Sequence, residues 1–163
     1  MKRIVDEGHT IGVHSYTHDY HQIYSSVDAF LDDFYQMYQK IYEVTGVKPS
    51  IFRFPGGSNT GYNKAIRDDV VAEMTRRGFT FYDWNIDSSD ASGNNIAASK
   101  LVTHTLGTSE GFNHGIVLMH DLGTKATTAD ALPEIIDGLR AQGYTFDKLT
   151  NELPSVNFLP KNK

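Results

Sequence analysis

The sequence predicts an α/β fold in which helices cover a parallel sheet. Short apolar runs alternate along the chain with longer segments whose apolar residues recur every three or four positions. The first pattern is typical of strands and the second of amphipathic helices, and their alternation predicts a parallel sheet that is either a barrel or open. At 163 residues the chain has the length of one domain, so we expect a single domain over residues 1–163.

Residues 1–54 are expected to hold two helices and two short strands. The longer helix begins at Ser25 or Ser26, with Asp28 as a capping-box acid for Ser25, and ends at Gly46. Its apolar residues predict one face that packs on the sheet: they are Phe30, Leu31, Phe34, Met37, Tyr38, Ile41 and Val44. The other elements are expected as a helix end over residues 2–7 and strands over residues 10–13 and 51–54.

The chain from residue 63 onward repeats this alternation of helices and strands. Residues 115–119 form the most apolar run of the chain, which predicts a fully buried strand. Gly78 and Gly143 mark the ends of two expected helices. The remaining elements are expected as helices over residues 63–77, from Asn94 or Asn95 to Leu106, and from Thr128 to Gly143, and as strands over residues 79–86 and 144–146.

Six polar residues stand just after the expected strands, where α/β sheets place their chemistry. Because the carboxyl ends of parallel strands lie at one rim, we expect these side chains to converge there. The arginine among them follows an apolar strand, which predicts either an ion pair with a carboxylate or a side chain that reaches out to solvent. The six residues are His14, His18, Arg53, Asp87, Asp90 and His120.

The spacing of His14 and His18 is typical of a metal half-site. Imidazoles four residues apart fall on one face of a helical turn, where both rings can point at one ion. A catalytic zinc ordinarily has three protein ligands, and because the chain has no cysteine, the third must be a carboxylate or another imidazole. Taken alone, the pair is explained equally well as two surface or capping histidines.

Charge and hydropathy argue against several classes of partner. The net charge is -5 and no Lys/Arg cluster is present, so nucleic acid and anionic membranes are not expected partners. No apolar run approaches the roughly 18 residues of a transmembrane segment. The first residues turn acidic where a signal peptide would be apolar, so we expect no signal peptide in this chain.

The motifs, taken in order, resemble those of a known family. They are His14-Ser-x-x-His18, Arg53-x-Pro55, Trp84 with Asp87-x-x-Asp90, and Leu118-x-His120. From residue 1 to about residue 150 the chain resembles the polysaccharide deacetylases of the NodB-homology type, carbohydrate esterase family 4, particularly the bacterial peptidoglycan deacetylases. The resemblance implies a distorted (β/α) barrel and metal-dependent hydrolysis of an N-acetyl group on a glucosamine-type sugar.

The resemblance also implies a role for each of these residues. His14 and His18 would bind the metal, which is expected to be Zn2+ or another divalent transition metal. His120 would be the general acid that protonates the leaving amine, and Asp87 would hold its imidazole. Arg53 would position the catalytic carboxylate, and a main-chain N–H near Gly56 would help to bind the oxyanion. The expected substrate contacts are Pro55, Gly56, Trp84, Asp90 and Leu118, with capping of the following loop as an equal alternative for Asp90.

One motif of the family does not appear in this sequence. A Thr-Phe-Asp-Asp-type element on the family's first strand supplies the general base and the third metal ligand. Neither Asp32-Asp33 nor Asp68-Asp69 replaces it, because both pairs are expected within helices. We therefore expect a barrel that lacks its first one or two strands, a third protein ligand absent from this chain, and an exposed sheet edge through which a dimer could form. Gly56 and Ala91 also stand where the family has aromatic residues.

Two functions remain open. The first is a metal-dependent N-deacetylase that acts on peptidoglycan or a related polysaccharide and needs upstream residues for activity. The second is a non-catalytic remnant of such an enzyme that binds glycan or metal. The substrate could be N-acetylglucosamine or N-acetylmuramic acid in peptidoglycan, or chitin oligomers. The family implies an extracellular or cell-envelope location.

Overall fold

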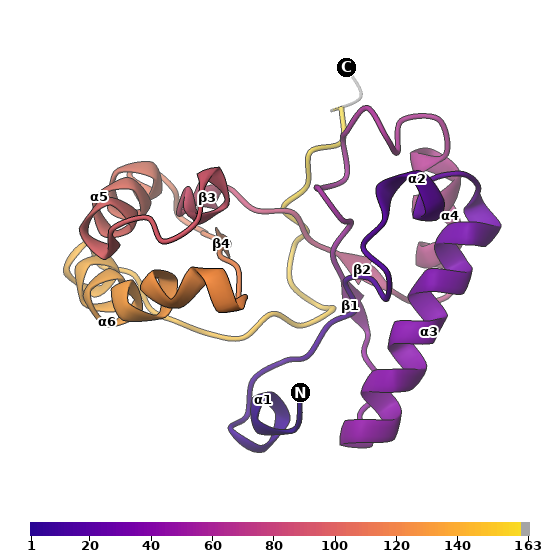
Figure 1. Ribbon diagram of the computed structural model, residues 1–163, viewed down its shortest axis with the longest axis horizontal. Helices are drawn as coiled ribbons and strands as arrows, with labels where there is room; N and C mark the ends of the chain where they lie inside the picture. Colours follow the sequence, from indigo (N-terminus) through magenta and orange to yellow (C-terminus); the bar gives the residue numbers. More distant parts are fainter. Residues whose placement is uncertain (161–163) are drawn as a thin grey trace. The chain divides into compact units, whose positions relative to one another are not determined.

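The computed structural model describes residues 1–160. The contacts divide the chain into a first unit, Met1–Asp83 with the segment that begins at Lys148, and a second unit, Trp84–Asp147. Each unit combines helices with a two-stranded parallel sheet, which is the predicted α/β class (Figure 1). This division does not test the single domain expected over residues 1–163, which stays a prediction. Among residues 1–160, no helix combines the length and apolarity needed to cross a bilayer.

The first unit is built on a short parallel sheet. Strand β1 pairs with β2 in the register Ile51 with Thr80 and Phe52 with Phe81, and an isolated bridge joins Val13 to the other side of Phe52. The elements of this unit are α1 (Lys2–Asp6), α2 (Tyr20–Ile23), α3 (Val27–Thr45), β1 (Ile51–Phe52), α4 (Arg67–Arg76) and β2 (Thr80–Phe81).

Helix α3 lies along this sheet and closes the core of the first unit (Figure 1). Ser26 is its N-cap, with Oγ accepting from the Ala29 N–H at 3.0 Å, and Gly46 ends it in the left-handed region at φ 72°. The predicted apolar face is confirmed at Phe34, whose ring centroid lies 5.7 Å from that of Phe52 on β1, but not at Val44, which is exposed near the end of the helix. The core is therefore dominated by aromatic rings, which pack edge-on or tilted against one another.

The end of the chain returns to the first unit. Tyr82 Oη donates to the carbonyls of Thr150 and Leu153, both at 2.7 Å. Asp83 is fully buried and accepts from the Phe158 N–H at 2.7 Å. These bonds fasten the last described residues beside β2.

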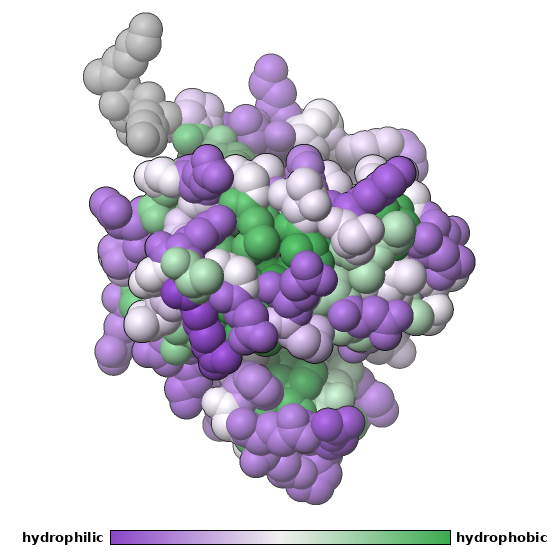
Figure 2. Space-filling model, turned by 90° about the vertical axis from the view of Figure 1, so that its left-hand side faces the viewer, coloured by the Kyte–Doolittle hydropathy of each residue, from purple (hydrophilic) through white to green (hydrophobic). Residues whose placement is uncertain are grey.

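The second unit packs two helices on a sheet of β3 and β4. Ile86 pairs with Val117 and Asp87 with Leu118. Its buried residues are mostly aliphatic: Leu101, Val102, Ala131, Ile135 and Leu139. Figure 2 draws one face of the molecule, on which apolar side chains lie in the middle and polar side chains surround them. The elements of this unit are β3 (Ile86–Asp87), η1 (Asp90–Ser92), α5 (Ala98–Ser109), β4 (Val117–Leu118), η2 (Gly123–Lys125) and α6 (Ala126–Ala141).

The strands are shorter than the apolar runs predicted. Residues 10–13 contribute only the bridge at Val13, residues 79–86 divide between β2 and β3, and residues 144–146 form no strand. Of the run expected to be fully buried, only Leu118 is buried, because a two-stranded sheet covers little of its own surface. Apolar runs predicted where strands lie, but pairing partners decided how far each strand extends.

Candidate metal and catalytic site

The histidine loop, residues 14–18, follows the bridge at Val13 and is not helical. The prediction that His14 and His18 share a helical turn is therefore wrong. Their rings are nevertheless neighbours, with centroids 5.1 Å apart and an angle of 55° between the planes. A tight turn brings them together, because His18 has a left-handed backbone at φ 56° and its N–H donates to Ser15 Oγ at 2.8 Å.

The main chain holds His14 in one tautomer. Its Nδ1 lies 2.9 Å from the carbonyl oxygen of Arg53. A carbonyl oxygen can only accept, so Nδ1 carries the proton and Nε2 has the lone pair that a metal ligand needs. His18, the second imidazole, is exposed to solvent. The two side chains fit the role of imidazole ligands for a zinc ion.

The histidine loop offers two imidazoles that fit the role of metal ligands. Within residues 1–160, no group of three or more His, Cys, Asp or Glu side chains is arranged to hold a metal ion. The acidic pairs of the sequence lie in helices, as predicted, with Asp32-Asp33 on α3 and Asp68-Asp69 on α4. The described part of the chain thus offers a half-site of two imidazoles. A catalytic zinc would need a further protein ligand.

The segment after β1 lies beside the histidine loop. The Arg53 N–H donates to the Val13 carbonyl at 3.0 Å, so the residue that fixes His14 is itself paired to the preceding strand segment. Tyr24 Oη donates to the Pro55 carbonyl at 2.7 Å, and burial raises the pKa of Tyr24, which keeps this donor protonated. The interaction of the Arg53 side chain with a catalytic carboxylate stays a prediction.

Gly56 adopts a conformation that glycine favours, with φ 78°. A Cβ at this position would lie 3.1 Å from Tyr20 Oη. The Tyr20 ring in turn contacts the rings of His18 and Tyr62, with centroids 5.3 and 5.2 Å away. An aromatic side chain from α2 therefore occupies the space beside position 56, although residue 56 itself has no side chain. This residue escaped the sequence analysis because nothing local links α2 to the turn after β1.

In the second unit, Asp90 holds His120 at two points. Its Oδ1 lies 2.8 Å from His120 Nδ1, and its Oδ2 accepts from the His120 N–H at 2.7 Å. Asp90 is 1% exposed, whereas the side chain of His120 is 31% exposed. The imidazole is thus anchored through Nδ1 at a buried carboxylate.

The surroundings of Asp90 favour its charged form. Burial by itself would raise the pKa of Asp90, but hydrogen bonds from the side chain and main chain of His120, together with the charge of His120 and the Thr128 hydroxyl, outweigh it and hold the pKa below its usual value. Thr128 Oγ1 donates to Oδ2 at 3.1 Å, and Lys125 Nζ donates to the Asp90 carbonyl at 2.5 Å. An ionised Asp90 accepts a hydrogen bond from Nδ1, so the Nδ1 nitrogen of His120 carries a proton.

The assignment of Asp87 as the residue that holds His120 is wrong. The Asp87 carboxylate instead accepts from the Ser89 N–H at 2.6 Å. Ser89 has a left-handed backbone at φ 59°, and the turn it makes directs Asp90 toward the end of β4. Asp90, and not Asp87, contacts the imidazole, and the predicted contact of Asp90 with substrate stays a prediction.

The other predicted substrate contacts remain predictions. Leu118 is 8% exposed, and its carbonyl accepts from Ser88 Oγ at 2.8 Å, which ties the ends of β3 and β4 together. Trp84 is half-buried at the start of the second unit. The structure brings together His14 with His18 in one unit and Asp90 with His120 in the other, and the convergence of these two groups stays a prediction.

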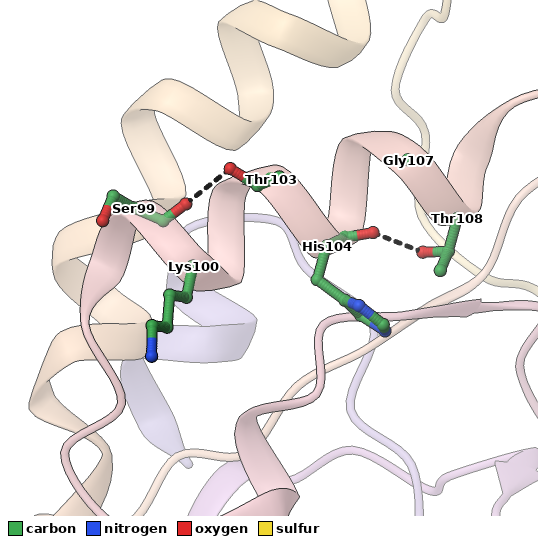
Figure 3. A pocket seen from close by; sticks show the side chains of 6 residues that line it. All are labelled: Ser99, Lys100, Thr103, His104, Gly107 and Thr108. Carbon is green, nitrogen blue, oxygen red and sulfur yellow. Dashed lines mark hydrogen bonds between the residues drawn. The ribbon is translucent and has the colours of Figure 1, made fainter.

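The second unit also has an open hollow of about 450 Å³ on the outer side of α5 (Figure 3). Two of its hydroxyls are engaged by main-chain carbonyls: Thr103 Oγ1 lies 2.9 Å from the Ser99 carbonyl, and Thr108 Oγ1 lies 2.9 Å from the His104 carbonyl and 3.0 Å from that of Asp87. None of the predicted site residues lines it: the lining residues are Ser99, Lys100, Thr103, His104, Gly107 and Thr108. This hollow is therefore not the candidate site.

Comparison with known proteins agrees with this fold. The model of the family described as polysaccharide deacetylase matches residues 1–81. The crystal structure of the catalytic domain of a peptidoglycan N-acetylglucosamine deacetylase from Eubacterium rectale is 36% identical, with a TM-score of 0.90 over 99% of this chain and 74% of that one. A family 4 pseudoenzyme from Bacillus anthracis is 28% identical, with a TM-score of 0.68 over 88% of this chain and 46% of that one.

Curated relatives are longer than this chain. A peptidoglycan-N-acetylglucosamine deacetylase from Bacillus cereus is 31% identical over 100% of this chain and 59% of its own length. The chain spans 54% of a polysaccharide deacetylase relative from Bacillus subtilis. The fold is therefore that of a deacetylase catalytic domain. The chain belongs to the polysaccharide deacetylase family, the NodB-type carbohydrate esterases of family 4.

Proposed function

We propose that this protein takes part in the metal-dependent hydrolysis of N-acetyl groups on amino sugars of peptidoglycan. The substrate class follows the relatives, which are named for peptidoglycan N-acetylglucosamine. N-Acetylmuramic acid is the alternative sugar, since another relative, from Bacillus subtilis, is named for it. A cell-envelope location follows from the same substrate.

One observation carries the proposal: the two imidazoles with assigned chemical roles are both fixed through Nδ1. His14 donates from Nδ1 to the Arg53 carbonyl at 2.9 Å, and His120 from Nδ1 to Asp90 at 2.8 Å. In each case Nε2, the second ring nitrogen, is the atom that the assigned role would use. With a neutral main-chain acceptor, His14 suits a metal ligand, and with an ionised carboxylate, His120 suits a proton donor.

The residues of this chain supply definite steps of the hydrolysis. When bound, a zinc ion supplies a Lewis acid that polarises the acetyl carbonyl. Water adds to the carbonyl carbon, the carbon–nitrogen bond breaks, and His120 Nε2 delivers its proton to the departing nitrogen, so that the products are acetate and a free amine. Asp90 stabilises the charged imidazolium before that transfer.

A carboxylate must take the proton from water and complete the metal site. We propose that it comes from residues beyond this sequence or from a neighbouring chain, because residues 1–160 offer no group of three suitable ligands. We propose likewise that the sheet is part of a distorted (β/α) barrel lacking its first one or two strands. The dimer expected through the exposed sheet edge stays a prediction.

A second candidate function is a non-catalytic domain that binds glycan or metal. It is favoured by the same two-ligand half-site and by the likeness to the Bacillus anthracis pseudoenzyme. The two candidates differ in whether acetate is released, so activity separates them.

The first test is the zinc content of the purified chain beside its His14→Ala variant, by elemental analysis. We expect about one ion per chain in the parent and a strong loss in the variant. His9→Ala is the matched control, since His9 is an exposed histidine of the same unit. Acetate release from peptidoglycan fragments then tests the reaction. A parent chain without zinc would overturn the proposal that His14 and His18 hold the metal in this chain, alone or with a neighbouring copy.

A further inference from the structure

Helix α3 carries a buried carboxylate that belongs to no part of the site described so far. Asp33 is 5% exposed, although it lies on a helix that faces a core of aromatic rings. It accepts four hydrogen bonds, and all of them come from the residues between the two histidines. The donors are Ser15 Oγ at 2.7 Å, the Tyr16 N–H at 2.9 Å, the Thr17 N–H at 2.8 Å and Thr17 Oγ1 at 2.7 Å.

The hold of this carboxylate extends to the second histidine. Ser15 Oγ donates to Asp33 and accepts from the His18 N–H at 2.8 Å. His18 has φ 56°, a left-handed backbone conformation that residues other than glycine rarely adopt. The chain of bonds from Asp33 through Ser15 therefore fixes the turn that places the His18 ring 5.1 Å from the His14 ring.

Helix α3 does not need Asp33 for its own stability. The helix is capped by Ser26, and Asp33 lies seven positions further on, where its first-turn N–H groups are out of reach. In the part of the chain that the structure describes, no lysine or arginine forms an ion pair with Asp33.

Dipoles stabilise the charge of Asp33. Burial alone would raise its pKa, but the hydrogen bonds from Ser15, Thr17 and Tyr16 outweigh it and hold the pKa below its usual value.

We propose that Asp33 is a positioning residue for metal binding, which holds the histidine loop in the conformation that turns both imidazoles toward one ion before the ion arrives. The proposal rests on the proposed function, because the ion is the zinc of the deacetylase site. The four hydrogen bonds of Asp33 come from residues 15–17 and not from the histidine rings. Asp33 acts on the main chain and hydroxyls of the loop, so that the ordering of residues 14–18 is already complete in the free protein.

The test compares Asp33→Asn with Asp32→Asn. Both variants lose one negative charge at neighbouring positions of α3, but Asp32 is exposed. In Asp33→Asn one carboxylate oxygen is replaced by an NH₂ group, which cannot accept a hydrogen bond from the donors of residues 15–17. Without metal, we expect the Tyr16 and Thr17 amides to exchange with solvent at least tenfold faster in Asp33→Asn, measured by NMR, and at the parent rate in Asp32→Asn.

Zinc affinity is the second readout, measured by competition with a chromophoric chelator. Loss of a residue that orients metal ligands weakens affinity by about 10- to 100-fold, and we expect this for Asp33→Asn and less than a twofold change for Asp32→Asn. Ser15→Ala interrupts the bond to His18 and leaves Asp33 in place, so it decides the question should Asp33→Asn fail to fold. We expect it to weaken zinc binding several-fold.

The outcomes separate this proposal from the function beneath it. Normal zinc binding in the parent and in both Asp33→Asn and Ser15→Ala would overturn the positioning role and leave the proposed function standing. A parent that binds no zinc would overturn both. Weaker zinc binding together with faster amide exchange in Asp33→Asn, and neither change in Asp32→Asn, supports the proposal.

Discussion

The two units use a buried carboxylate for different purposes. Asp33 in the first unit receives its hydrogen bonds from main-chain N–H groups and hydroxyls. Asp90 in the second unit is bonded to a group that can itself gain and lose a proton, the imidazole of His120. Asp33 therefore controls the conformation of a loop, whereas Asp90 controls the orientation of a side chain. The partners of a buried carboxylate, more than its burial, decide what it does.

The largest effect is expected at Asp90. In Asp90→Asn the ionised partner of His120 is lost, so we expect kcat for acetate release to fall by about 10²- to 10⁴-fold, the usual contribution of acid–base catalysis. Asp87→Asn is the matched control, since Asp87 contacts the Ser89 N–H and not the imidazole. A larger loss in Asp87→Asn than in Asp90→Asn would restore the original assignment. This assay uses the longest form of the protein that releases acetate.

A smaller effect is expected on stability in acid. The pKa values of Asp33 and Asp90 are both lowered in the folded chain, below the ordinary value of about 3.9. Between that value and the lowered one, the unfolded chain binds protons that the folded chain does not, so the free energy of unfolding falls as pH falls. Above the ordinary value the stabilisation is complete.

Denaturant unfolding at pH 7, 4 and 3 measures this loss. We expect Asp33→Asn to lose less stability between pH 7 and pH 3 than the parent, because a buried carboxylate with a lowered pKa is gone. Asp32→Asn, at an exposed position of the same helix, should follow the parent. An equal loss in Asp33→Asn and the parent would show that Asp33 is not stabilised in its charged form.

The smallest effects are expected from hydroxyls that support each carboxylate. Thr17→Val removes a bond of 2.7 Å to Asp33, and Thr128→Val removes one of 3.1 Å to Asp90. We expect each to lower the free energy of unfolding by about 1–2 kcal/mol, measured by denaturant titration. Thr103→Val is the control, because this exposed hydroxyl bonds only the carbonyl of its own helix. A change in the control as large as in the other two would remove the distinction between supporting and ordinary hydroxyls.

Much of the fold could be predicted from local patterns. The apolar face and the terminal Gly46 of α3, and the placement of strands at residues 51 and 117, follow from periodicity and turn residues that act over a few positions. The lengths of the strands could not be predicted in this way. Strand length depends on which partner lies alongside, as the single bridge at Val13 illustrates.

A carboxylate within the apolar face of α3 was a signal that could have been used earlier. Asp33 stands between Phe30 and Phe34, both buried, and a charge at such a position requires hydrogen-bond partners. The identity of those partners, residues 15–17, could not be deduced, since nothing in the spacing of the sequence relates α3 to the histidine loop.

The sequence by itself determined the family, the chemical types of the site residues and their order along the chain. Only the tertiary structure decided that Asp90 rather than Asp87 holds His120, and that a turn rather than a helix brings His14 and His18 together. The reason is geometric. Spacing along a chain restricts which residues can be neighbours, but the left-handed turns at His18 and Ser89 decide which of them are.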